Sequence, residues 1–104
     1  MDFTHSHHDA SHHFSLKGQF TFSDNGKFRQ VLELVKSGAA QSITVNLAGV
    51  EFMDSAALGM LLLLGEEAKQ RSISICLEHP NGQVKKMFAL AKLGELFHVV
   101  EKAG

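Results

Sequence analysis

The chain has 104 residues, of which 44% are hydrophobic and 20% are charged, so it can bury one core of ordinary size and we expect a single domain. Ten basic residues against 11 acidic ones give a formal net charge of -1, which argues against binding to nucleic acid or to an anionic membrane surface. The single cysteine, Cys76, excludes an internal disulfide, and the N-terminus lacks the pattern of a secretory signal, so we expect a cytoplasmic protein.

The first 13 residues are polar and contain five of the seven histidines. We interpret residues 1–13 as an N-terminal arm or an edge strand and residues 14–104 as the domain. Imidazoles near an aspartate can bind Zn, Ni or Cu. However, the strand alternation that would place His5 and His7 on one face sends His8 to the other, so we expect no ordered metal site.

Residues 14–22 alternate apolar and polar side chains, which is typical of a half-buried strand, with Gly18 marking a kink or a close contact. Residues 23–26 end this strand. Apolar residues then recur at the i, i+3, i+4, i+7 spacing of an amphipathic helix that ends near residue 38: Phe28, Val31, Leu32 and Val35.

Two further strand and helix pairs follow. Residues 42–47 alternate and precede a helix that starts near Ser55, whose apolar run of residues 56–64 is about half of the roughly 20 residues needed to cross a bilayer. We therefore expect a core helix that is covered on most sides, without membrane insertion. Residues 72–77 predict a third strand, residues 84–91 a third helix, and residues 96–100 an edge strand.

Strands that alternate with helices predict parallel pairing, because antiparallel neighbours can be joined by much shorter turns. The two central strands keep a polar row, so we expect helices mainly on one face. The predicted fold class is α/β, with a mostly parallel sheet of four to five strands.

Ser55 lies where a strand passes through an Asp-Ser step into a helix. A serine at a helix N-terminus is either a cap or a place where a phosphate is stabilised. Catalysis by this serine is not expected, because the glycines of a Gly-x-Ser-x-Gly elbow and a positioned base are missing. No phosphate-binding loop is present either, so we expect no enzyme activity, no catalytic residues and no cofactor.

Residues 52–55 (Phe-Met-Asp-Ser) followed by Leu58-Gly59 resemble the signature of the STAS domain of bacterial anti-sigma-factor antagonists. Residues 16–20 look like the first core strand of that family, and residues 83–88 with Leu93 look like its third helix. The resemblance implies that Ser55 is phosphorylated by the cognate anti-sigma factor, a protein kinase. The unphosphorylated form would bind that kinase and free the sigma factor, with ATP belonging to the partner.

The same resemblance implies a partner-binding surface around Ser55, formed by the residues that flank it: Asp54, Ala56, Ala57, Leu58, Gly59 and Met60. Three positions depart from the family pattern. The family commonly has Ser or Thr at Ala56, Gly at Ala57 and an acidic residue at Thr21. The departures at Thr21 and Ala56 favour an alternative, a constitutive STAS subunit of a membrane lipid transporter or of a signalling assembly, in which Ser55 only caps the helix. The sequence leaves the oligomeric state open.

Overall fold

The computed structural model describes residues 1–93 and 97–100. The strands are β1 (Asp2–His8), β2 (Ser11–Phe20), β3 (Ser42–Met53), β4 (Ser74–Glu78) and β5 (His98–Val100). The helices are α1 (Asn25–Ser37), α2 (Ser55–Gln70) and α3 (Gly82–Ala91), with a short 3-10 turn, η1 (Phe22–Asp24), before α1.

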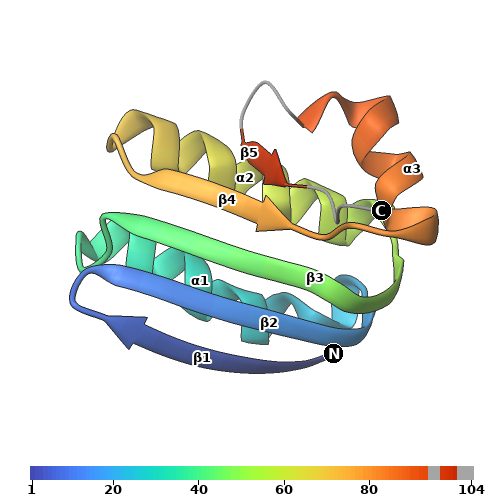
Figure 1. Ribbon diagram of the computed structural model, residues 1–104, viewed down its shortest axis with the longest axis horizontal. Coiled ribbons are helices and arrows are strands. Elements are labelled where there is room, and N and C mark those ends of the chain that lie inside the picture. Colours follow the sequence, from blue (N-terminus) through green and yellow to red (C-terminus); the bar gives the residue numbers. More distant parts are fainter. Residues whose placement is uncertain (94–96, 101–104) are drawn as a thin grey trace.

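The strands form a mostly parallel sheet in the order β1-β2-β3-β4-β5. Only β1 is antiparallel to its neighbour; the pairs from β2 to β5 are parallel, with a helix between each two strands. Figure 1 shows α1 and α2 together on one face of the sheet and α3 near the carboxyl end of β4, while the other face carries none of the described helices. The predicted fold class, with helices mainly on one face, is confirmed.

The core lies between the sheet and the helices. It contains one row of side chains from each central strand, including Phe14 and Leu16 of β2 and Val45 and Leu47 of β3, while Ser15 of the alternate row is exposed. The helices contribute residues at helical spacing: Phe28, Val31 and Val35 from α1, and Ala57, Leu61, Leu64 and Ala68 from α2. The expectation that α2 is covered on most sides is wrong at Leu63, whose surface is 50% exposed.

Strand β2 differs from its predicted range at both ends. It begins at Ser11, so the boundary that we placed between residues 13 and 14 falls inside a strand, and it ends at Phe20. Gly18 has φ 91°, a conformation that favours glycine, and the pairing of β2 with β3 changes register there, in agreement with the predicted kink.

Strands β4 and β5 also differ from their predicted ranges. β4 starts at Ser74 rather than at residue 72, and β5 spans His98–Val100; the predicted residue 96 lies outside the described residues. Among the described helices, none combines the length and the apolar character that crossing a membrane requires.

Candidate functional site

The start of α2 is capped by Asp54 and not by Ser55. Asp54 has an extended backbone, and its Oδ1 accepts a hydrogen bond from the N–H of Ala57 at 2.8 Å. Ser55 is the first residue of the helix, its side chain is exposed, and its hydroxyl has no hydrogen-bond partner among the described residues. The interpretation of Ser55 as the cap is therefore wrong, because the preceding carboxylate already satisfies the N–H group that a capping side chain would accept from.

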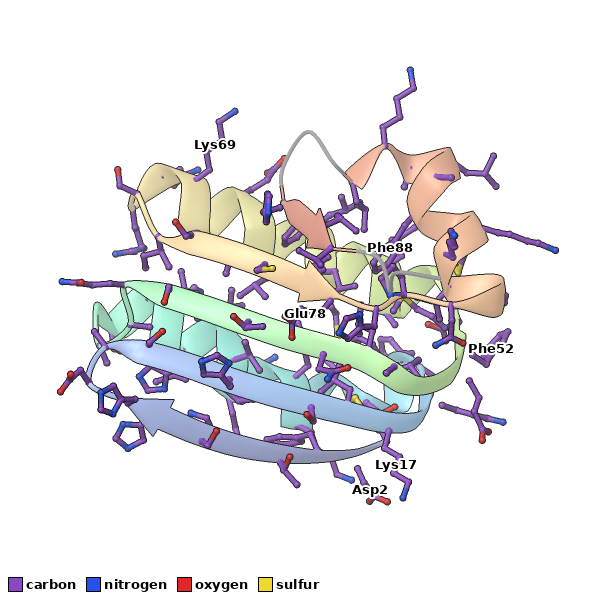
Figure 2. The ribbon with its side chains drawn as sticks, in the orientation of Figure 1. Asp2, Lys17, Phe52, Lys69, Glu78 and Phe88 are labelled. Atoms are coloured by element: carbon purple, nitrogen blue, oxygen red, sulfur yellow. The ribbon has the colours of Figure 1, made fainter. Side chains whose placement is uncertain are left out.

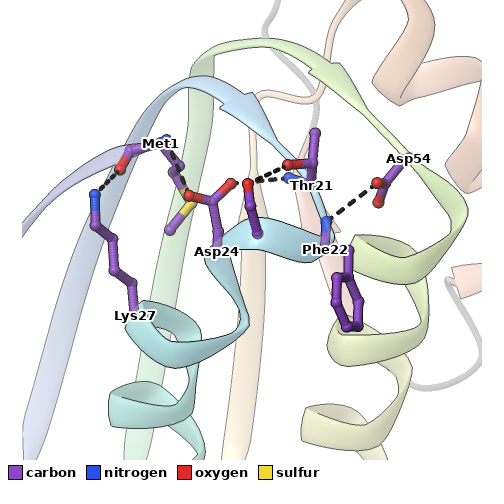
Figure 3. Close-up of polar contacts among 7 residues, drawn as sticks. Met1, Thr21, Phe22, Asp24, Lys27 and Asp54 are labelled. Carbon is purple, nitrogen blue, oxygen red and sulfur yellow. Dashed lines mark hydrogen bonds and ion pairs between the residues drawn. The ribbon is translucent and has the colours of Figure 1, made fainter.

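The second carboxylate oxygen of Asp54 connects the helix start to η1. Oδ2 accepts from the backbone N–H of Phe22 at 3.1 Å, as Figure 3 shows. The backbone N–H of Asp54 donates to the carbonyl of Phe20 at 3.3 Å. Asp54 thus binds its neighbours with both side chain and backbone, and this fixes the backbone just before Ser55 relative to η1.

Asp24 organises the other end of η1. Its Oδ2 accepts from the N–H of Thr21 at 2.9 Å and its Oδ1 from the ammonium group of Met1 at 3.0 Å, while Lys27 Nζ donates to the Met1 carbonyl (Figure 3). Burial by itself would raise the pKa of the Asp24 carboxyl, but the Thr21 hydrogen bond and the Met1 ammonium outweigh burial and lower this pKa below its ordinary value. The family commonly has an acidic residue at the position of Thr21. In this chain the carboxylate that binds within η1 is that of Asp24, three residues later.

Gln83 holds the end of β3 in place of a neighbouring strand. The pairing of β3 with β4 ends at Asn46, so Met53 lies beyond it. The side-chain amide of Gln83 accepts from Met53 N–H at 3.0 Å and donates to the Met53 carbonyl at 2.8 Å. The residue immediately before Asp54 is thereby fixed to the first turn of α3. The sequence signal for this role was only the resemblance of residues 83–88 to the family's third helix.

The predicted partner-binding residues differ in exposure. Gly59 is exposed with Ser55, and four others are half-buried: Asp54, Ala56, Leu58 and Met60. Ala57 is fully buried, so its inclusion in a binding surface is wrong; its methyl group packs in the core on the inner side of α2.

Two exposed phenylalanines beside this turn were not predicted. Phe22 is 69% exposed and Phe52 is 42% exposed, and Figure 2 places Phe52 at the outer end of β3. Alternation continued from Phe14, Leu16 and Phe20 would bury Phe22. Alternation counted from Val50 would bury Phe52. β2 ends before Phe22, and Glu51 is skipped in the pairing of β3 with β2, so the buried positions become Val50 and Met53.

A groove of about 340 Å³ lies between α1 and α2. Its apolar lining comes from both helices and includes Phe28, Leu32, Met60 and Leu63. Polar and charged residues of α1 complete the lining: Asn25, Arg29, Glu33 and Lys36.

The histidine cluster of β1 and β2 and the single cysteine are two further candidate sites. The rings of His5, His7 and His12 lie close together, with His5 Nε2 2.8 Å from His12 Nδ1. The described residues contain no group of three or more His, Cys, Asp or Glu side chains placed to hold a metal ion. Burial and, to a lesser extent, Glu78 raise the pKa of the Cys76 thiol, which keeps it in its unreactive neutral form.

The Ser55 hydroxyl is exposed at the positive end of a helix. No base among the described residues contacts this hydroxyl, so none of them activates it as a nucleophile. A phosphate there would add about -1.5 to -2 charges at the positive end of a helix, which favours it by about 0.3–1 kcal/mol at an exposed site. The carboxylate of Asp54 would oppose it. Phosphorylation would thus change the charge of the surface without requiring the helix to rearrange.

Comparisons with known proteins agree with this description. The family model described as "Mlab, STAS domain" matches residues 3–101. A STAS-domain containing protein of Pseudomonas aeruginosa (strain UCBPP-PA14) is 32% identical over 84 residues, which cover 81% of this chain and 82% of the relative.

Three solved structures show the same fold. An anti-sigma factor antagonist from Mycobacterium paratuberculosis has a TM-score of 0.80 and 17% identity, covering 97% of this chain and 87% of that one. The phosphorylated form of the Bacillus cell fate determinant SpoIIAA has a TM-score of 0.78 and 21% identity, covering 94% and 90%. A sulfate transporter family protein from Wolinella succinogenes has a TM-score of 0.73 and 14% identity, covering 88% and 77%. At these identities the structures establish the fold alone.

Proposed function

Since the chain belongs to the STAS-domain family, we propose that it is an anti-sigma-factor antagonist that works as a phosphorylation-switched adaptor. In this function, unphosphorylated Ser55 is part of a surface that binds a kinase-type anti-sigma factor in the cytoplasm. The kinase transfers the terminal phosphoryl group of ATP to the Ser55 oxygen. The products are phosphoserine, ADP and the proton released from the hydroxyl. The phosphorylated protein then dissociates.

One observation carries the proposal: Ser55 presents an exposed hydroxyl at the helix start, while Asp54 makes the capping hydrogen bond. Because the hydroxyl has no structural bond to lose, it is available to a modifying enzyme. Phe22, whose backbone N–H donates to Asp54, and Phe52, three residues before Ser55, are also exposed, and aromatic residues are enriched in protein interfaces.

The switch follows from electrostatics. A contact that fits a neutral hydroxyl does not supply partners for three phosphate oxygens, and removing an unmatched charge from water costs several kcal/mol. The nearby Asp54 carboxylate would add repulsion rather than compensation. Phosphorylation should therefore weaken binding of the partner.

The direct test is incubation of the protein with the cognate kinase and ATP, followed by intact-mass measurement. We expect one added phosphate in the wild type and none in Ser55→Ala. Ser23→Ala is the matched control, since Ser23 is an exposed hydroxyl in η1, and it should be labelled like the wild type. Labelling that persists in Ser55→Ala would contradict the proposal.

A second function is favoured by specific observations. Threonine at position 21 and alanine at position 56 fit a constitutive STAS subunit of a lipid transporter or signalling assembly. Affinity capture from the native cell extract with wild type and Ser55→Asp separates the two functions. An adaptor should lose its main partner in Ser55→Asp, whereas a constitutive subunit should retain it and recover transporter ATPase subunits.

A further inference from the structure

Strand β1 forms an open edge of the sheet. It pairs with β2 on one side and with none of the other described strands. All seven of its residues pair in unbroken register, from Asp2 opposite Lys17 to His8 opposite Ser11. Edge strands are usually protected by lysine, proline, a bulge or short length, and β1 has none of these features. Its outer backbone groups are therefore available to another strand.

The sequence of β1 is complementary to itself. When two copies of one strand pair antiparallel about a two-fold axis, the residue numbers of each opposing pair add up to the same value. The two side chains of such a pair point to the same face of the sheet. All seven residues of β1 overlap only when the axis passes through His5. This register places Asp2 opposite His8 of the second copy, Phe3 opposite its His7, and Thr4 opposite its Ser6.

Each of these oppositions is chemically favourable. Asp2 and His8 are both exposed, and an imidazole N–H can donate to a carboxylate whether the ring is neutral or protonated. Lys17 already faces Asp2 from β2 (Figure 2), so the carboxylate would lie between two basic groups. Phe3 and His7 form an aromatic pair, and the hydroxyls of Thr4 and Ser6 can bond to each other.

The residue on the axis, His5, meets its own copy. Its ring stacks on Phe14, with centroids 4.3 Å apart, and its Nε2 is 2.8 Å from His12 Nδ1. Burial, together with His12 and His7, lowers the pKa of His5, so this ring is neutral at pH 7 and its meeting with the second His5 brings no repulsion. The register thus creates no like-charged pair at neutral pH.

We propose that the protein forms a two-fold dimer through antiparallel pairing of β1 with β1 of a second copy, which joins the two sheets into one. The pairing uses the edge of the sheet and leaves α2 uncovered, so a dimer presents two Ser55 sites. A strand of this length buries less than the about 800 Å² per partner of a standard interface, so we expect a dissociation constant on the order of 100 µM. This proposal is independent of the partner that binds near Ser55.

Sedimentation velocity of the full chain between 10 µM and 1 mM gives the first test. The apparent mass should rise from 11.4 kDa toward twice that value. Asp2→His and His8→Asp each remove both Asp–His pairs of the dimer, and His8→Asp also places two carboxylates opposite each other twice. Each variant should therefore raise the dissociation constant about tenfold. The double variant restores the complementary pairs and should return to within about twofold of the wild type. A wild type that stays monomeric at 1 mM, or single variants that dimerise unchanged, would overturn the dimer.

Disulfide trapping tests the register. In a Cys76→Ser background, His5→Cys places two thiols opposite each other at the axis, where antiparallel Cα atoms lie about 4.5–5.5 Å apart, within reach of a disulfide. Thr4→Cys is the matched control, because Thr4 opposes Ser6 and not itself. Covalent dimer in His5→Cys and little in Thr4→Cys supports the proposed register. Equal trapping of both variants, or trapping of Thr4→Cys alone, would overturn it.

Discussion

Replacing Asp54 by alanine should destabilise the protein by about 2 kcal/mol. Loss of the capping bond to Ala57 N–H removes about 1 kcal/mol, and loss of a negative charge at the helix start removes about 0.3–1 kcal/mol more. The bond to Phe22 N–H is exposed, so water replaces it and its loss adds about 0.5 kcal/mol. At about 4–8 °C per kcal/mol for a domain near this size, the midpoint of thermal unfolding should fall by about 8–16 °C.

Ser55→Ala is the matched control for this experiment. The Ser55 hydroxyl has no bond to a described residue, so its removal should change the free energy of unfolding by less than about 0.5 kcal/mol. Thermal unfolding followed by circular dichroism measures both variants under the same conditions. If Ser55→Ala lost as much stability as Asp54→Ala, the serine would be the functional cap and the basis for its availability to a kinase would be wrong.

Three further predictions concern the support of this site. Gly65→Ala should cost about 1–3 kcal/mol in urea unfolding, because a Cβ would lie 2.6 Å from the Phe97 ring, whereas Gly59→Ala has open space and should be neutral or slightly stabilising. Gln83→Ala should cost about 1–3 kcal/mol through its two lost backbone bonds, and Gln83→Glu, which can still accept but not donate, should lose less. The Asp24 carboxylate, whose pKa is lowered from 3.8, stabilises the fold above that value and loses its effect as the pH falls through the folded pKa, so Asp24→Asn should reduce the difference in stability between pH 5 and pH 2.5.

Most of the architecture could be predicted because it depends on periodicity. The helical spacing of Phe28, Val31 and Val35 and the alternation of Val45 and Leu47 identify buried faces whatever the tertiary details, and those residues are buried. The helices between the strands then require a parallel sheet. The first strand was harder to predict, because an edge strand of histidines and hydroxyls carries almost no apolar signal.

The finer features of the site depend on pairing that periodicity does not encode. Two register shifts in the pairing with β2, one between Asn46 and Gly49 and one at Glu51, make Val50 and Met53 the buried residues and leave Phe52 exposed. The exposure of Phe22 results from the end of β2 at Phe20. Whether Asp54 or Ser55 caps the helix depends on one turn of backbone, and either residue type is a good cap. The burial of Ala57 follows from the orientation of α2, which a resemblance to a family signature does not specify.

The turn between β3 and α2 is attached to three other elements, and this affects how a partner protein would bind to it. The turn is held by β2 through Phe20, by η1 through Phe22 and by α3 through Gln83, so hydrogen bonds restrain its backbone from three elements before anything docks. Docking on such a pre-organised turn needs little ordering of the backbone, so the entropic cost of association is small and most of the contact energy remains as affinity. Recognition at this turn should therefore depend on shape and charge and proceed as a single rapid step, without a folding step that would slow the encounter.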